Sequence, residues 1–264
     1  MAETGDEPVE TTAEETVNMT ENSVRASRTA TVAHYLLVAA IVLMVASPLS
    51  NHLGLVDFTV AIPMFLVGAV ATLLAILVGI GGIVTTRSAA GRGKALTALV
   101  GGIIIIGITV LMIVPNMAYP PIHDISTDTV NAPEFVALRA ARDAAPNETD
   151  YEGGEVAEQQ LAAFPNLMTF VSTQPGRDVF DASEQVVADM GWDIAAAVPA
   201  DGRIEATATT RIFGYKDDVV IRIRPTMDGT TVVDVRSASR VGGGDLGANA
   251  ARITEFLTAL QAAL

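Results

Sequence analysis

Cysteine is absent from the 264-residue chain, and histidine occurs only three times. Without cysteine the protein has no disulfide, thiol nucleophile, iron–sulfur cluster or thiolate zinc site. The few histidines leave little for a histidine-built metal centre, so we expect no metal and no bound cofactor. Basic residues are also scarce, because 16 Lys and Arg face 30 Asp and Glu, and the formal net charge is −14. Such a chain lacks the basic surface that binding to nucleic-acid phosphates requires, so we expect no nucleic-acid partner.

Charged residues make up only 17% of the sequence and hydrophobic residues 50%, which is too apolar for an ordinary soluble domain. The mean hydropathy is +0.42. Charge is missing from three long stretches, which lie between Arg28 and Asp57, between Asp57 and Arg87, and between Lys94 and Asp124. Each contains an apolar run near the ~20 residues that a helix needs to cross a bilayer. We therefore predict membrane-spanning helices at about 32–50, 60–84 and 95–115, with the lipid bilayer as a partner.

The charge pattern divides the chain into three predicted parts. Residues 1–28 are acidic and poor in large apolar side chains, so we expect a disordered acidic tail. Residues 29–115 form a three-helix membrane anchor, and residues 116–264 form an exported domain. Basic residues flank the first span and lie between the second and third, at Arg25, Arg28, Arg87, Arg92 and Lys94. The positive-inside rule then predicts a multi-pass protein of the bacterial inner membrane, with a cytoplasmic N-terminus and a periplasmic C-terminal domain.

The predicted anchor carries no signature of transport. The second and third spans contain no acidic or basic residue, whereas transporters usually place such groups at membrane depth. Small residues at Ala71, Ala75 and Gly79 recur every four positions, a spacing that lets helices approach closely. Two interpretations stay open: packing among the three helices, or association with another membrane protein through this face.

Helical and strand patterns both occur in the exported domain. Asn131, Pro133 and Glu134 are typical of an N-cap, a first-turn proline and a capping-box acid. The predicted helices are about 132–144, 155–163, a segment from Asp181 to Gly191, and 249–263. Period-two alternation predicts strands at 192–198, 203–212, 219–224 and 233–236. The predicted fold class is therefore α+β, a two-layer domain with a four-stranded antiparallel meander and covering helices.

The sequence of the last hairpin favours one register. A two-residue turn would set apolar residues opposite charged ones. A three-residue loop at 227–229 instead pairs Ile221 with Val235 and Arg222 with Asp234. We predict the second register, because it keeps apolar and charged residues on separate faces.

Four segments of the exported domain are distinctive. They are Ile122-His-Asp-Ile-Ser-Thr-Asp128, Gly191-Trp192, Gly214-Tyr-Lys-Asp-Asp218 and Asp234-Val-Arg-Ser-Ala-Ser-Arg-Val-Gly-Gly-Gly-Asp-Leu-Gly-Ala-Asn-Ala-Ala-Arg-Ile253. Together they resemble a bacterial domain-of-unknown-function family, number 1499, over nearly the whole exported domain. Members often carry apolar segments ahead of the domain, as this chain does. Since the family has no agreed activity, the resemblance implies a type of domain and supplies no reaction.

The glycine-rich loop near the C-terminus also matches a dinucleotide fingerprint at Gly242, Gly244 and Gly247. We reject that interpretation because the preceding strands form antiparallel hairpins and the following helix ends the chain, so no parallel βαβ unit exists.

Arg252 breaks a local rule. If Asn249 caps the last helix, Arg252 occupies its third position, where the positive end of the helix dipole disfavours a cation. Two explanations stay open: an internal pair with Asp245, which we favour, or an external phosphate or carboxylate bound by arginines and loop amides. The candidate ligand, an anionic small molecule or a lipid headgroup, would contact Arg236, Arg240, Gly243, Gly244, Asp245, Asn249 and Arg252.

The polar face of the predicted sheet has two interpretations. It is either an anion-binding platform or a solvated face with cross-strand ion pairs, which we favour. Its arginines are Arg203, Arg211, Arg222, Arg224 and Arg236.

The candidate catalytic residues are His123, Asp124 and Asp128, which together resemble an acid/base set or ligands of a hard metal. We favour a docking segment whose Asp and Thr side chains bond backbone amides.

The sequence favours the hypothesis that the chain is a non-catalytic inner-membrane protein that presents a periplasmic binding or scaffold domain in the cell envelope. One alternative is a membrane-anchored hydrolase or transferase that acts on an envelope substrate through Asp124 and Asp128. Another is a subunit of a membrane complex. The enzyme alternative requires those carboxylates to line a cavity together with arginines, so whether the domain catalyses a reaction stays open at this point.

Overall fold

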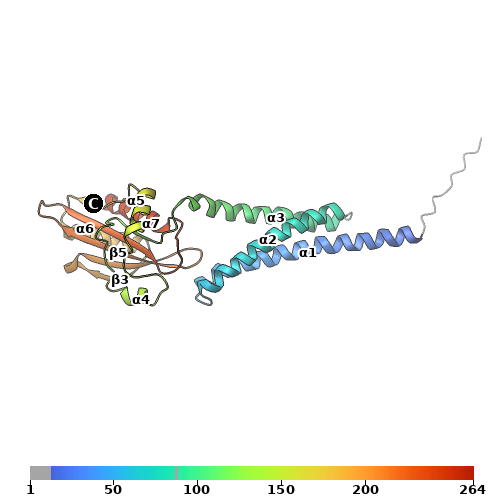
Figure 1. The fold of residues 1–264 in the computed structure, drawn as a ribbon, viewed down its shortest axis with the longest axis horizontal. Helices are drawn as coiled ribbons and strands as arrows, with labels where there is room; N and C mark the ends of the chain where they lie inside the picture. Colours follow the sequence, from blue (N-terminus) through green and yellow to red (C-terminus); the bar gives the residue numbers. More distant parts are fainter. Residues whose placement is uncertain (1–12, 87–88) are drawn as a thin grey trace, which may run out of the picture. The chain divides into compact units, whose positions relative to one another are not determined.

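The computed structural model describes residues 13–86 and 89–264. The chain forms two compact units, and Figure 1 shows their elements. The first contains the long helices α1 (Ala13–His52), α2 (Phe58–Thr85) and α3 (Ala89–Ile113). The second contains the C-terminal α+β domain.

All three long helices have segments long and apolar enough to cross a membrane, at Arg28–His52, Phe58–Thr85 and Gly91–Ile113. The chain is therefore a membrane protein. Helix α1 begins at Ala13, so residues 13–28, which we expected to be disordered, are helical. Residues 1–12 of the predicted tail lie outside the described part of the chain.

The small residues of the first unit let its helices pack closely. Ala75 has no exposed surface, and a Cβ added at Gly79 would lie 3.1 Å from the carbonyl oxygen of Ala95 on α3. A Cβ at Gly68 would lie 2.6 Å from the side chain of Met44 on α1. The small-residue stripe thus serves packing among the three helices, the first of the two interpretations.

The C-terminal domain is built on one antiparallel sheet with strand order β1-β6-β5-β4-β3, and β2 also pairs with β6. The α+β class is confirmed, but the sheet has six strands where we predicted four. Their bounds are β1 (Asp124–Ser126), β2 (Phe170–Ser172), β3 (Asp193–Val198), β4 (Arg203–Thr209), β5 (Lys216–Pro225) and β6 (Thr231–Ser239).

The predicted register of the last hairpin is confirmed. Ile221 lies opposite Val235, and Arg222 lies opposite Asp234. Because side chains alternate along each strand, this register separates an apolar face from a charged face across β4, β5 and β6.

Helices α6 (Gly176–Asp189) and α7 (Ala248–Ala263) pack on the apolar face. Their buried residues join the strands in the main core, where Ile253, Phe256 and Leu260 of α7 have no exposed surface. Helix α6 begins earlier than the predicted Asp181. Helix α5 (Gly154–Ala163) agrees with the predicted 155–163, and its Gln160 side chain bonds both the backbone N–H and the carbonyl of Ser126 on β1.

The charged face is covered by residues 130–153, which we call the covering segment. Its Phe135 and Leu138 form a small core with Val220 and Ala238. The prediction that this face is solvated was therefore wrong, whereas the cross-strand ion pair of Arg222 and Asp234 forms at 2.8 Å. The predicted helix 132–144 was also wrong, because only the short helix α4 (Arg139–Asp143) forms there. The remaining helical turns are η1 (Val114–Ala118) and η2 (Pro199–Asp201).

Candidate functional site

Charged side chains lie almost fully buried between the sheet and the covering segment. Those on the strands alternate with apolar residues, so the same pattern that predicts the sheet directs them to this face, and Arg142 reaches it from α4. The buried charged residues here are Asp124, Arg142, Glu205, Asp218, Asp234 and Arg236.

Asp124 and Arg236 form a two-point ion pair at the centre of this face. Arg236 donates from Nε to Oδ1 at 2.9 Å and from Nη2 to Oδ2 at 2.6 Å. Its guanidinium also donates to the carbonyl of Thr149 and lies 4.9 Å from the ring centre of Phe135. The carboxylate and guanidinium therefore satisfy each other while almost fully buried.

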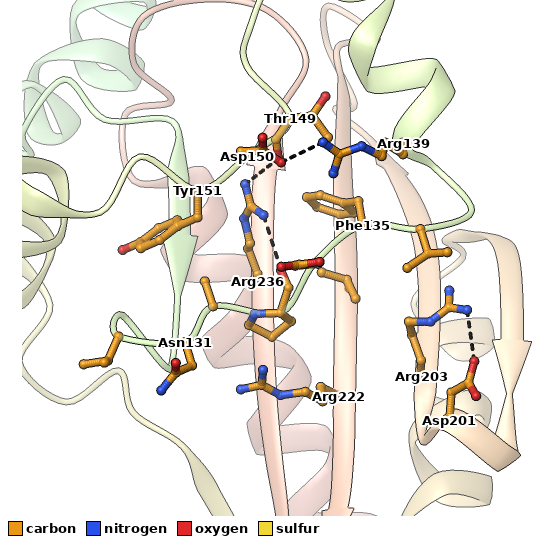
Figure 2. A pocket seen from close by; sticks show the side chains of 16 residues that line it. Asn131, Phe135, Arg139, Thr149, Asp150, Tyr151, Asp201, Arg203, Arg222 and Arg236 are labelled. Atoms are coloured by element: carbon orange, nitrogen blue, oxygen red, sulfur yellow. Dashed lines mark hydrogen bonds and ion pairs between the residues drawn. The ribbon is translucent and has the colours of Figure 1, made fainter.

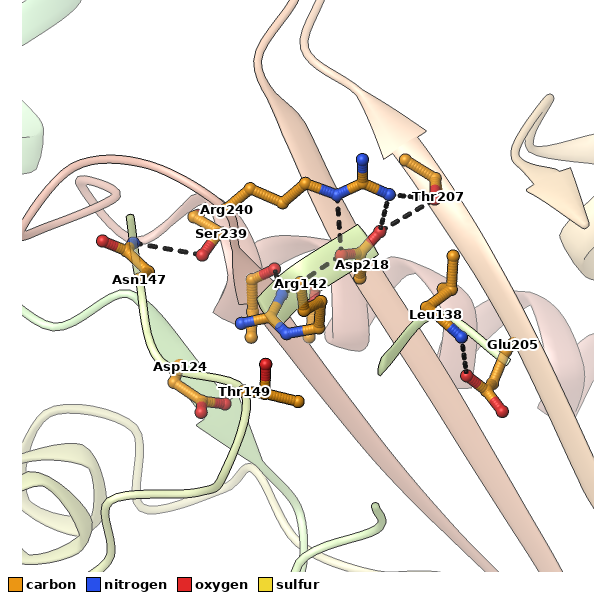
Figure 3. A network of polar contacts seen from close by, with 12 residues as sticks. Asp124, Leu138, Arg142, Asn147, Thr149, Glu205, Thr207, Asp218, Ser239 and Arg240 are labelled. Carbon is orange, nitrogen blue, oxygen red and sulfur yellow. Dashed lines mark hydrogen bonds and ion pairs between the residues drawn. The ribbon is translucent and has the colours of Figure 1, made fainter. Parts of the chain in front are cut away.

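Asp218 is the centre of a second cluster, shown in Figure 3. It accepts hydrogen bonds from Arg240 at 2.8 and 2.9 Å, from Arg142 at 3.2 Å and from the hydroxyl of Thr207 at 2.8 Å. The bonds to Asp218 raise the pKa of Arg240, whereas burial lowers that of Arg142. Arg240, a candidate ligand-binding residue, is thus already held by an internal acid.

Glu205 is a buried residue that the sequence analysis did not single out. Its carboxylate accepts the backbone N–H groups of Val136, Ala137 and Leu138 at 2.9–3.1 Å, and Arg203 also donates to it. Figure 3 shows the bond from Leu138. Three successive amides that converge on one carboxylate resemble an anion site whose anion the protein itself supplies. This bond set fixes the covering segment to β4.

The other two candidate catalytic residues are also engaged by neighbours. Asp128 accepts the N–H groups of Val130 and Asn131 and pairs with Arg222 at 3.0 Å. Burial alone would raise the pKa of Asp128, but these amide bonds and Arg222 lower it below its ordinary value. His123 Nε2 lies 3.6 Å from a Glu152 oxygen. In the described part of the chain, no three His, Asp or Glu side chains gather as metal ligands would.

The glycine-rich loop differs from the prediction. Helix α7 begins at Ala248 with Gly247 as its N-cap, so Asn249 is not the cap. The Asp245 carboxylate accepts the N–H groups of Gly247 and Asn249 at 2.8 and 2.6 Å. Burial raises the pKa of Asp245, and these two bonds oppose that effect. The Gly247 and Asn249 amides therefore bind an internal carboxylate in place of an external anion. Within this described loop, Asp245 accepts no hydrogen bond from the predicted site residues Gly243 and Gly244.

Arg252 pairs with Asp217 on β5, at 2.6 Å, and not with Asp245 as we predicted. It also donates to Ser237 and to the side chain of Asn249. These contacts lie on the helix-covered face, opposite the face that carries Arg236 and Arg240. The structure thus separates the candidate ligand-binding residues into two clusters on opposite sides of β6.

A cavity of about 790 Å³ opens beside the buried pair of Asp124 and Arg236. Figure 2 shows Arg139 bonded to Asp150 at its top and Arg203 bonded to Asp201 at its lower right. The cavity is lined by Val130, Asn131, Ala132, Pro133, Glu134, Phe135, Val136, Arg139, Thr149, Asp150, Tyr151, Asp201, Arg203, Val220, Arg222 and Arg236. Neither His123 nor Asp124 nor Asp128 is among these residues. The arrangement offers guanidinium donors and apolar surface to a ligand.

Three long apolar helices followed by a domain of this topology define a membrane protein with a C-terminal α+β domain. Residues 124–260 match the family model described as protein of unknown function (DUF1499). The match spans more than half of the chain, and the chain therefore belongs to the DUF1499 family. No curated protein matches the chain.

Proposed function

We propose that the chain is a bacterial inner-membrane protein with a cytoplasmic N-terminus and a periplasmic C-terminal domain. The supporting observation is the distribution of basic residues around the three apolar helices. Arg25 precedes the first span and Arg28 begins it, and Arg92 and Lys94 lie at the start of the third. Residues 53–57, which connect α1 to α2, contain no Lys or Arg. By the positive-inside rule, this asymmetry favours that orientation.

Reporter fusions test the orientation. A reporter active only in the periplasm should be active after Leu264 and inactive near Arg92. A third fusion within 53–57 serves as a control and should also be active. The reverse pattern would contradict the proposed location of the domain.

The domain, in this proposal, acts in the cell envelope by binding or as a scaffold rather than by catalysis. Its candidate acid/base residues, Asp124 and Asp128, hold the covering segment and β1 in place, and neither lines the cavity. This arrangement favours a structural role for both carboxylates over the hydrolase or transferase alternative, which needs them in a substrate site.

Substitution of these carboxylates distinguishes the two roles. If they are structural, Asp124→Asn and Asp128→Asn each lower the Tm of the domain. A variant with wild-type Tm that fails to complement a deletion strain would favour catalysis.

Native mass spectrometry of the detergent-solubilised protein shows whether a lipid, an anion or another membrane protein co-purifies. A co-purifying membrane protein is the result expected if the chain is a subunit of a membrane complex.

A further inference from the structure

We propose that the cavity of Figure 2 binds a small ligand that carries an oxyanion, a carboxylate or a phosphate group, through Arg139, Arg203 and Arg222. The inference rests on the proposed function, because it assigns a class of ligand to the proposed binding domain. It differs from the glycine-rich loop predicted as the anion site, where Asp245 already accepts the Gly247 and Asn249 amides and Arg252 is paired with Asp217.

The shape of the cavity suits a small molecule. Its volume of about 790 Å³ falls within the ~300–1,000 Å³ of typical ligand sites. Pro133, Val136 and Val220 supply apolar lining, and arginines supply directional donors. A ligand with an apolar body and an anionic group would match both kinds of surface.

The basic groups of the cavity lie deeper than its acidic groups. The side chains of Arg203 and Arg222 are 17% and 23% exposed, whereas those of Asp201 and Asp150 are 57% and 77% exposed. A ligand that enters past the outer carboxylates therefore meets guanidinium groups. Burial also raises the pKa of Tyr151 to about 12, so this lining residue adds no negative charge at neutral pH.

The outer carboxylates are easily replaced as partners. Arg139 pairs with Asp150 at 3.0 Å near solvent, and Arg203 pairs with the exposed Asp201 at 3.3 Å as well as with the buried Glu205. Solvent-exposed ion pairs contribute little to stability, so a ligand oxyanion can replace either outer carboxylate at small cost, while Arg203 keeps its bond to Glu205. Arg236 is different, because it is committed to the buried Asp124.

Arg222 retains a donor that no described residue satisfies. Its Nη2 donates to Asp128 and Asp234, whereas its Nε is buried without a hydrogen-bond partner. Leaving a buried donor unpaired is unfavourable, so the Arg222 side chain gains a hydrogen bond if it turns its Nε toward a ligand oxygen in the cavity.

Calorimetric titration of the detergent-solubilised full chain tests the proposal, with inorganic phosphate and succinate as probes at constant ionic strength. We expect saturable binding of at least one probe. Binding should weaken about tenfold or more in Arg139→Gln and in Arg203→Gln, because each loses a charge-assisted bond. Asp150→Asn should bind more tightly, because the competing carboxylate is gone. The fluorescence of Trp192 confirms that each variant is folded.

Arg177→Gln is the matched control, since Arg177 forms an exposed pair with Asp181 outside the cavity and should leave binding unchanged. A second arm uses nanodiscs of phosphatidylglycerol or phosphatidylcholine. If the protein has a higher Tm in phosphatidylglycerol nanodiscs than in phosphatidylcholine nanodiscs, and Arg203→Gln removes this difference, a lipid headgroup is the source of the oxyanion.

The absence of saturable binding of phosphate, succinate and phosphatidylglycerol would overturn the proposal, as would equal weakening in Arg177→Gln. Either result leaves the orientation of the domain standing, because the reporter fusions measure it independently. A ligand or partner found elsewhere on the domain by native mass spectrometry would overturn the cavity assignment and still support a binding domain.

Discussion

Asp124→Asn removes the negative charge from an almost fully buried ion pair of the domain and keeps the size of the side chain. The side chains of Arg236 and Asp124 are 1% and 3% exposed, so the remaining guanidinium would keep its charge in an almost fully buried position. Loss of one partner of a buried pair costs about 3–5 kcal/mol. We expect about 3 kcal/mol, because Arg236 keeps its bond to Thr149 and its contact with Phe135.

The double variant supplies the decisive comparison. Arg236→Met alone leaves the Asp124 carboxylate buried without its partner, and we expect the free energy of unfolding to fall by about 3 kcal/mol or more. The double variant with Asp124→Asn and Arg236→Met has no unpaired charge. Its loss of unfolding free energy should therefore be smaller than the sum of the two single losses by about 2 kcal/mol. The chain has a single tryptophan, Trp192, which stacks on Phe256 in the core of the domain. Its fluorescence during urea unfolding of the detergent-solubilised chain therefore reports on this domain alone.

An exposed substitution provides the control for this cycle. Arg177→Met should change the free energy of unfolding by less than about 0.5 kcal/mol. Additive effects of the two single substitutions, or a loss below about 1 kcal/mol for each, would refute the view that this pair stabilises the charged face.

Three further predictions concern other parts of the domain. Arg252→Ala and Asp217→Ala should be coupled by more than about 1 kcal/mol in a double-mutant cycle of urea unfolding, whereas Arg252→Ala and Asp245→Ala should be nearly additive. The pKa of Asp128 is lowered from its ordinary value of 3.8, so its charged form adds stability above that pH and the contribution disappears as pH falls through the lower folded value. The stability difference between wild type and Asp128→Asn, measured by thermal unfolding, should therefore be present at neutral pH and vanish in acid. Gly202→Ala should lower the Tm strongly, because Gly202 has φ of +60° and a Cβ there would lie 2.0 Å from a carbonyl oxygen of β5; an unchanged Tm would contradict this turn geometry.

Local patterns predicted those elements that carry several alternating or periodic residues. Strands β4, β5 and β6 each contain enough alternation to reveal a buried face, and opposite charges at Arg222 and Asp234 selected the register. Strands β1 and β2 contain only three residues each, too few for a period of two to be visible. They are strands because they pair with β6, and β6 lies far from both of them in the sequence.

Long-range partners also explain the wrong predictions about the site. The capping pattern at Asn131 and Glu134 predicted a helix, but Glu205 holds the amides of residues 136–138 in another conformation. Similarly, Asp245 was chosen as the partner of Arg252 because it is near in sequence. The actual partner, Asp217, lies 35 residues away on a strand beneath α7. The cavity was not predicted, because it exists only where the covering segment meets the sheet.

The pairing of β1 and β2 with β6 sets the order in which the domain can be completed. Strand β6 is the last strand to be synthesised, yet both short strands depend on it, and Asp124 meets its counter-charge only when Arg236 arrives. Such non-local closure slows folding. Residues 124–172 therefore wait for the ribosome to finish most of the domain, and a chain interrupted before Thr231 leaves both strands and a carboxylate without their partners.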